Sequence, residues 1–401
     1  MYKLLLTALL IAGTSIQAYC QKENFKQHIS YLASDELKGR YTGSAGEKLA
    51  STYIIEQLSA NGINNLKGNK AKGGYLQIFT YHPKTDKGKS KVSGSNVAAY
   101  IDNGAATTVV IGAHYDHLGM GDPHHSTYRG EPAVHNGADD NASGVAMVIE
   151  LGKKLKESKY KNNNYLLLFF SGEELGLYGS KWFVEHPMLD LKKVNYMVNF
   201  DMVGRVDSNK IVVYGTGTSP VWKDAMKVKT PLHIKESESG VGPSDHTSFY
   251  LKDIPVLHVF SGQHSDYHKP SDDEAKINYK GMEDIFNYTL QLIANVDGKG
   301  KIGFIKTKDE NHDNAPKFSV TLGVMPDYTY EGDGMRIDGV TDGKPAAKAG
   351  LEKGDIVIQL GDIVVKDMMG YMQALSKFKK GDATKVKVKR KGETIEKDIQ
   401  F

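Results

Sequence analysis

The stretch TVVIGAHYDH, residues 108–117, decides how this sequence folds. Its first half, residues 108–112, is a short run without polar alternation, which is typical of a strand buried on both faces. Similar runs occur elsewhere in the chain, with helical spacing of apolar residues between several of them. The predicted strands lie at 97–101, 108–112, 165–170, 194–200, 211–214 and 256–260, and the predicted helices at 144–156 and 281–296. Strands that alternate with helices predict an α/β fold with a largely parallel central sheet.

Imidazole and carboxylate side chains follow four of these predicted strands: His114, Glu173 with Glu174, Asp201, and His268. In open α/β sheets the ligand crevice lies at the carboxyl ends of the strands, so these groups should share one edge. A single acidic residue after a strand is usually a helix cap or a turn residue. Four strands that deliver such groups to the same edge instead indicate a functional site.

A metal centre is the chemistry that this set of side chains favours. Carboxylates in one crevice repel each other and would raise each other's pKa values, and divalent cations remove that penalty. Two histidines and three carboxylates, without a thiol, suit zinc in an open catalytic site. A pair of metal ions about 3.5–4 Å apart needs a bridging carboxylate, and together the ions polarise a carbonyl and activate water.

The residues beside these motifs have predicted roles of their own. One of the adjacent carboxylates Glu173 and Glu174 should bind metal while the other stays free as a general base; the alternative is a charged turn. Asp116, two residues after His114, should fix the tautomer of that imidazole through its other ring nitrogen. Four further histidines are expected at the surface or the pocket rim and not on metal: His117, His124, His125 and His135.

The N-terminal segment predicts export. Residues 4–13 form an apolar run that follows Lys3 and is too short to span a bilayer. Small residues at positions 18 and 20 then suit a cleavage site that leaves Gln21 as the new N-terminus. We therefore predict a signal peptide at 1–20, a periplasmic or extracellular protein, and no transmembrane span; a lipid anchor on Cys20 is the less favoured alternative. Because Cys20 is the only cysteine, cleavage after it would exclude disulfides, thiol catalysis and cysteine-ligated zinc.

Chain length and net charge limit the number of domains and the kinds of binding partner. A chain of 401 residues predicts two or three domains. The formal net charge of +3 is spread over 51 basic and 48 acidic residues, and we expect no nucleic-acid partner. A polar segment rich in glycine and lysine at 297–317 is interpreted as an interdomain linker, which leaves one domain at 21–296 and another at 318–401.

Five motifs occur in a characteristic order: GAHYD (112–116), GADDNASG (137–144), GEELG (172–176), NFDM (199–202) and YHKPSD (267–272). Together they resemble the two-zinc aminopeptidase family that includes bacterial leucyl aminopeptidase, glutamate carboxypeptidase and glutaminyl cyclase. The similarity covers about residues 32–296, beginning with LASDELKGR at 32–40. It implies a three-layer zinc-peptidase fold with a mixed, largely parallel central sheet.

The resemblance also implies a role for each site residue. His114 and Asp201 would bind one Zn²⁺, Glu174 and His268 the other, and Asp140 would bridge the two. The catalytic residues would be Glu173 as general base, Asp116 beside the metal-binding imidazole, and Tyr267, which in some relatives donates a hydrogen bond to the tetrahedral intermediate. The Asp140–Asn141 peptide is typically cis in this family, and residues 244–249 resemble a loop that lines the substrate pocket.

The C-terminal domain resembles a bacterial PDZ domain. LGV at 322–324 is similar to the carboxylate-binding loop, and KPAAKAGL at 344–351 followed by GDIV at 354–357 is similar to the turn-and-strand signature. This implies a small β-rich domain that captures a peptide or protein C-terminus.

Aminopeptidase is the favoured function, with peptides as substrates. A carboxypeptidase or dipeptidase of the same fold is the second candidate function. Arg129 and Arg205 are the nearest residues that could then bind a substrate carboxylate. A glutaminyl cyclase, which uses one zinc, is a third. A non-catalytic PDZ binding protein would require lost ligands, and none is lost from the motifs.

Overall fold

The computed structural model describes residues 21–68, 74–81, 91–121, 125–128, 130–307, 320–326, 330, 332–341, 343–366 and 368–401. The predicted signal peptide at 1–20, with Cys20, lies outside the described residues, as do His124, Arg129 and residues 308–317 of the predicted linker. The predicted domain boundaries stay predictions.

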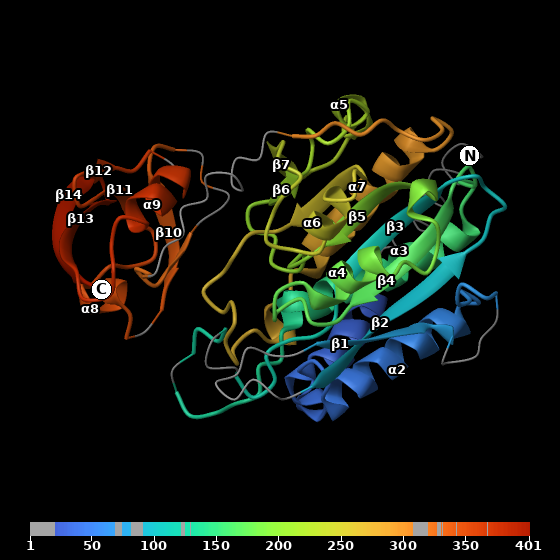
Figure 1. The fold of residues 1–401 in the computed structure, drawn as a ribbon, viewed down its shortest axis with the longest axis horizontal. Coiled ribbons are helices and arrows are strands. Elements are labelled where there is room, and N and C mark those ends of the chain that lie inside the picture. The colour runs from blue at the N-terminus through green and yellow to red at the C-terminus, as the bar shows by residue number, and fades with distance from the viewer. Residues whose placement is uncertain are drawn as a thin grey trace, which may run out of the picture.

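A mixed eight-stranded sheet dominates the larger unit (Figure 1). Its strands are β1 (Leu76–Tyr81), β2 (Val92–Ile101), β3 (Thr108–His114), β4 (Asn164–Phe170), β5 (Val194–Phe200), β6 (Lys210–Tyr214), β7 (His233–Ser237) and β8 (Val256–Phe260). They pair in the order β1-β2-β4-β3-β5-β8-β6-β7. Strands β4, β3, β5 and β8 run parallel to one another, and β6 runs parallel to β7. The pairs β1–β2, β2–β4 and β8–β6 are antiparallel. The α/β prediction with a mixed, largely parallel sheet is confirmed.

Helices cover both faces of this sheet (Figure 1). Residues 21–32 are helical, and the other helical elements include η1 (Asp35–Arg40), α2 (Ala45–Ala60), η3 (Ala138–Ser143), α3 (Gly144–Glu157), α4 (Tyr178–Glu185), η4 (Leu191–Lys193), α5 (Trp222–Ala225), α6 (His246–Tyr250), η5 (Glu274–Lys276) and α7 (Tyr279–Val296).

Two hydrophobic clusters, one on each face, define the three layers. Successive residues of a strand point to opposite faces. Accordingly, Val109 and Ile111 pack in the cluster that includes residues of α2, α3 and α7, whereas Val110 packs in the cluster with residues of α4 and α6. Every residue of β3, β4, β5 and β8 is buried, which explains why these strands are continuous apolar runs in the sequence.

A second, antiparallel sheet with its own core forms the C-terminal unit. It contains β9 (Val324–Pro326), β10 (Met335–Val340), β11 (Ile356–Leu360), β12 (Ile363–Val364), β13 (Ala383–Arg390) and β14 (Glu393–Gln400), with the helices α8 (Pro345–Lys348) and α9 (Met368–Leu375). The order is β14-β13-β11-β10-β9, so β9 is an edge strand among the described strands. The prediction of a small β-rich domain is confirmed.

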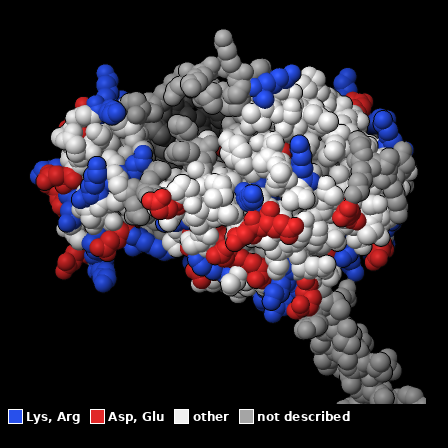
Figure 2. Space-filling view, turned by 90° about the horizontal axis from the view of Figure 1, so that it is seen from below, with Lys and Arg blue, Asp and Glu red and all other residues white. Residues whose placement is uncertain are grey.

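Basic and acidic side chains are interspersed over both units on the face drawn in Figure 2, as the small net charge leads one to expect. Within the described part of the chain, we find no helix with the length and apolar character needed to cross a membrane.

Candidate functional site

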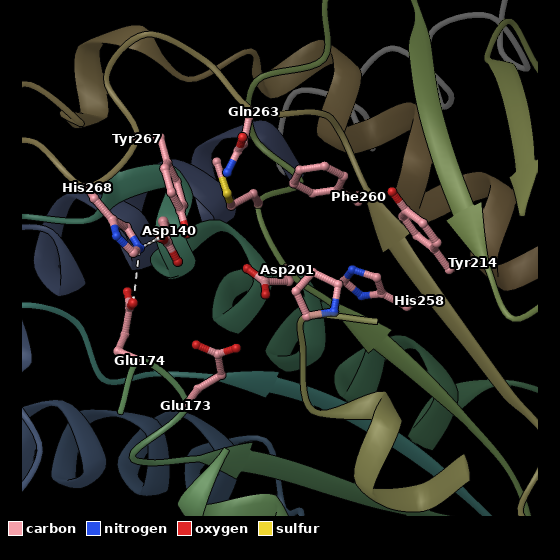
Figure 3. Close-up of a pocket in the computed structure, with 12 residues that line it drawn as sticks. Asp140, Glu173, Glu174, Asp201, Tyr214, His258, Phe260, Gln263, Tyr267 and His268 are labelled. Atoms are coloured by element: carbon pink, nitrogen blue, oxygen red, sulfur yellow. Dashed lines mark ion pairs between the residues drawn. The ribbon is translucent and has the colours of Figure 1, made fainter. Parts of the chain in front are cut away.

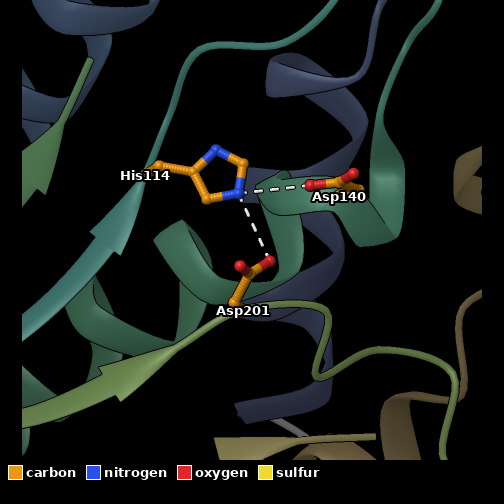
Figure 4. Close-up of side chains that lie close together, drawn as sticks. All are labelled: His114, Asp140 and Asp201. Atoms are coloured by element: carbon orange, nitrogen blue, oxygen red, sulfur yellow. Dashed lines mark hydrogen bonds and ion pairs between the residues drawn. The ribbon is translucent and has the colours of Figure 1, made fainter. Parts of the chain in front are cut away.

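The predicted ligands meet at the carboxyl ends of the central strands. His114 is the last residue of β3, Asp201 directly follows β5, and Glu174 lies in the turn after β4. Asp140 lies in η3, ahead of α3, and His268 lies in the loop after β8. The edge predicted from strand topology is therefore where the structure brings these side chains together (Figures 3 and 4).

The first group of ligand atoms is centred on His114 (Figure 4). Its Nε2 atom is 3.2 Å from Asp140 Oδ1 and 3.2 Å from Asp201 Oδ1. The other ring nitrogen, Nδ1, lies 3.2 Å from the backbone carbonyl of Asp116 and 3.7 Å from its carboxylate. That carboxylate accepts hydrogen bonds from the backbone N–H of Glu173, at 3.2 Å, and from the Thr42 hydroxyl, at 3.0 Å. Asp116 thus contacts both His114 and the turn that carries Glu173.

The second group of ligand atoms surrounds Glu174. His268 Nε2 is 3.1 Å from Asp140 Oδ2 and 3.0 Å from Glu174 Oε2 (Figure 3). The two oxygens of Asp140 therefore face two different imidazoles, Oδ1 toward His114 and Oδ2 toward His268. This is the arrangement that a carboxylate shared between two metal ions requires.

His117 and His135 correct the prediction that four histidines lie at the surface or rim. Both are buried. His117 Nδ1 is 2.7 Å from Glu174 Oε1, so this residue belongs to the second group. His135 contacts the Ser126 hydroxyl at 2.7 Å and is in neither group. His125 is half-buried, and its backbone carbonyl lies 2.8 Å from His268 Nδ1.

The adjacent glutamates have opposite electrostatic surroundings. Burial raises the pKa of Glu173 well above its usual value, and Asp201 and Asp245 raise it further, although His114 acts against them. Burial and Asp140 would also raise the pKa of Glu174, but His268 and His117 outweigh them and hold it at about 2. Glu174 therefore stays ionised, as a metal-binding carboxylate must, whereas Glu173 holds a proton more readily than an ordinary carboxylate.

Imidazole nitrogen and carboxylate oxygen, with no sulfur, are the donors that zinc takes in catalytic sites. The side chains of the first group, His114, Asp140 and Asp201, are held with their ligand atoms within 4.8 Å of one another, and so are those of His117, Asp140 and Glu174. The residues present therefore fit a pair of divalent ions.

A buried cation supports the loop that carries Asp140. The Arg40 guanidinium donates to the backbone carbonyls of Tyr115 at 2.8 Å, Asn136 at 2.7 Å and Gly137 at 3.1 Å, and also to that of Leu32. Each such charged hydrogen bond contributes about 1.5–3 kcal/mol, which offsets the cost of burying the cation. Burial lowers the pKa of Arg40 to about 10. Arg40 ends the LASDELKGR segment, but nothing in the sequence pattern assigns it to this loop.

Asp272 is a second supporting residue that sequence reasoning did not assign. It accepts the backbone N–H groups of Asp139 and Asp140, each at 3.0 Å, just before the Asp140–Asn141 peptide. That peptide is cis, as the family resemblance implied.

A cavity opens beside the ligand atoms (Figure 3). Apolar and aromatic side chains form the wall away from the ligands: Met202, Tyr214, Pro243, His258 and Phe260. Tyr267 stacks on His268 with ring centroids 3.7 Å apart, and burial together with Asp140 and Glu174 raises the pKa of its phenol well above the usual value. Tyr267 therefore keeps its proton and can donate a hydrogen bond into the cavity.

The loop predicted to line the substrate pocket lies behind the cavity wall instead. Pro243 reaches the cavity, whereas Asp245 and His246 are fully buried. The His246 ring stacks on His258 at 4.4 Å, so the loop supports a wall residue. Burial raises the pKa of Asp245 to about 7. Its position next to the charges of the site could not be read from sequence spacing.

Comparisons with known proteins agree with the fold. Residues 96–293 match peptidase family M28, and residues 302–401 match the PDZ domain. A probable leucine aminopeptidase of Trichophyton verrucosum is 25% identical over 300 residues, which cover 72% of this chain and 68% of the relative. Leupeptin-inactivating enzyme 1 of Streptomyces exfoliatus is 30% identical over 257 residues, covering 61% of this chain and 50% of that enzyme.

Solved structures show the same fold. The aminopeptidase from Aneurinibacillus sp. strain AM-1 has a TM-score of 0.53 at 17% identity, covering 73% of this chain and 96% of its own. Porphyromonas gingivalis glutaminyl cyclase has a TM-score of 0.55 at 17% identity, covering 69% of this chain and 98% of its own. The chain is thus a peptidase that belongs to family M28 and carries a PDZ domain.

Proposed function

We propose that this protein is an exported, zinc-dependent aminopeptidase that hydrolyses the N-terminal residue from peptides. The observation that carries the proposal is the position of Asp140, whose two oxygens face His114 and His268, each beside a further carboxylate. The names of the fungal relatives, probable leucine aminopeptidases, support the same activity.

The ligands would divide into two sets that share Asp140. His114 and Asp201 would complete one zinc site, and Glu174 and His268 the other. When bound, the zinc ions would supply Lewis acidity, which polarises the scissile carbonyl and acidifies the attacking water.

The protein's own residues would move the proton and hold the substrate. Glu173 would accept a proton from the water and return it to the leaving amine, and its raised pKa makes it a stronger base than an ordinary carboxylate. Asp116 would hold Glu173 in place through the hydrogen bond to its backbone N–H. The Tyr267 phenol would stabilise the oxyanion that develops on the substrate.

The lining of the cavity favours recognition of an amine over a carboxylate. Of the described residues that line it, none is lysine or arginine. Arg205, a candidate partner for a substrate carboxylate, is paired with Asp266 at 3.2 Å and is not among these lining residues. A lining without a basic side chain suits a protonated N-terminus better than a substrate carboxylate, and Met202, Tyr214 and Phe260 suit an apolar first side chain. Carboxypeptidase, dipeptidase and glutaminyl cyclase activities remain the competing proposals.

Release of p-nitroaniline from a leucyl anilide tests the proposal. We expect hydrolysis that stops after exhaustive chelation and returns with zinc, because both ligand groups depend on metal to offset their charge. The N-acetylated anilide should not be cleaved, because it lacks the protonated amine. Equal cleavage of the acetylated compound, or activity that survives chelation, would exclude a zinc aminopeptidase; cyclisation of an N-terminal glutamine would favour the glutaminyl cyclase alternative.

For the PDZ domain we propose capture of a peptide or protein C-terminus by β-addition at the edge strand β9. Gly323, with φ of +75°, lies in the predicted carboxylate-binding loop, and its carbonyl accepts the N–H of Thr341 at 2.8 Å. Apolar residues of α9 and of the segment just after it pack within the domain itself. Leu375 packs in the domain core, and Phe378, just beyond the helix, packs on Phe401 at 5.2 Å.

Deletion of the residues after Lys317 tests this role. Because the two units have separate cores, we expect the truncated enzyme to hydrolyse leucyl anilide at the rate of the full chain. Cleavage of longer peptides should be slower, since the PDZ domain no longer binds their C-terminus. Loss of anilide hydrolysis would instead make the domain a structural support.

Export is likewise our proposal, since the signal segment lies outside the described residues. N-terminal sequencing of the mature protein should begin at Gln21; a retained Met1 argues against export, and a lipid-bearing Cys20 would place the protein on a membrane.

A further inference from the structure

His117 is a buried histidine of the second group that neither of the two proposed zinc sites includes. It lies three residues after His114, where the chain has left β3, and its side chain is wholly buried. Its backbone N–H donates to the carbonyl of Arg40 at 3.2 Å. A buried imidazole next to carboxylates needs a compensating partner, so its contacts decide what it does.

The Nδ1 atom of His117 is directed at the second group of ligand atoms. It lies 2.7 Å from Glu174 Oε1 and 4.0 Å from Asp140 Oδ2. The ring meets that of His268 edge-on, with centroids 5.8 Å apart and an interplanar angle of 71°. Glu174 is thus held between two imidazoles, with Oε1 toward His117 and Oε2 toward His268. The opposite nitrogen, His117 Nε2, has no hydrogen-bond partner among the described residues.

Close packing keeps the ring in this orientation. Gly137 has φ of +60°, and a Cβ atom there would lie 2.6 Å from His117 Cδ2 and 2.2 Å from the Asp140 carbonyl oxygen. Arg40 fixes the same loop through the carbonyl of Gly137. The imidazole and the bridging carboxylate are therefore packed against one backbone segment, which leaves the ring little freedom to turn away.

We propose that His117 Nδ1 is an additional ligand of the second zinc site, which then comprises His117, His268, Asp140 and Glu174. This inference rests on the two-zinc site proposed above. The first site has three protein donors, one of them an imidazole, whereas the second would have four, two of them imidazoles. A four-donor zinc site is closed, as in structural sites, and a three-donor site keeps an open position, as in catalytic ones. The second ion should consequently be held more tightly than the first and be the last to leave under chelation.

Proton NMR of the full-length, cobalt-loaded protein tests the assignment without relying on activity. An imidazole bound to paramagnetic Co²⁺ through one nitrogen shows a strongly shifted, exchangeable proton on the other. We expect three such signals, from His114, His268 and His117, and only two in His117→Gln. Two signals in the unaltered protein would overturn the proposal and leave His117 as a hydrogen-bond partner of Glu174. No shifted imidazole signal at all would instead contradict the two-metal site itself.

Zinc competition with a chelator gives the second readout. In His117→Gln the tighter of two zinc affinities should fall by at least the roughly 10–100-fold that loss of an outer-shell partner costs. The matched control is His28→Gln, because His28 is a buried imidazole that lies 3.1 Å from a carboxylate, Glu150, and belongs to neither ligand group. The His28→Gln protein should show three shifted proton signals and the same two zinc affinities as the unaltered protein. An unchanged tight affinity in folded His117→Gln would count against the proposal.

Discussion

Glu173→Gln is expected to retain zinc and to lose turnover by about 10²–10⁴-fold, the usual contribution of a general base. Glutamine has the same shape as glutamate but cannot accept the proton. The Glu173 carboxylate lies in neither group of ligand atoms, so its loss should leave the metal sites intact. Burial also raises its pKa, which a residue that exchanges protons near neutral pH requires and a permanent ligand does not.

The measurement is kcat for leucyl anilide together with zinc content by elemental analysis. Glu150→Gln is a control, since Glu150 is a buried carboxylate that pairs with His28 and Lys153 away from the cavity. It should keep both zinc and turnover. If Glu173→Gln proves to be the zinc-depleted protein, the roles of the two glutamates are reversed.

Glu174→Ala is expected to lose the second zinc ion and, with it, essentially all activity. Both oxygens of Glu174 contact imidazoles, and its pKa of about 2 keeps it ionised under all conditions in which the enzyme would work. Removing this charge leaves His117 without its nearest carboxylate and leaves Asp140 as the carboxylate beside His268. The remaining donors cannot balance a dication in a buried site.

Zinc content after gel filtration should fall from two ions per chain to one or none. Excess zinc should restore little activity, which separates a lost ligand from slow loading. Glu150→Ala controls for the loss of a buried carboxylate as such. Two tightly held ions in Glu174→Ala would show that the carboxylate is not a ligand.

The sequence by itself determined the central strands of the sheet and the candidate site residues that lie at its edge. Strands β3, β4, β5 and β8 are buried on both faces, so their apolar runs are continuous and easily recognised. The same topology places the residues that end or follow these strands at one edge, which is why His114 and Asp201 were expected to lie at a common edge of the sheet. Strand β7 was not predicted, because this edge strand is only half-buried and its residues are largely polar.

The tertiary structure alone decided which neighbouring groups complete the site. His117 was expected at the rim, because sequence spacing does not reveal which way a loop turns after its strand. Its place beside Glu174 depends on packing against Gly137, and Arg40 reaches that same loop across 97 positions of sequence. Asp245 and His246 were likewise expected on the pocket wall and lie behind it. The local sequence pattern indicates whether a residue is buried within a helix or strand. Contacts between loops instead depend on how the whole chain packs.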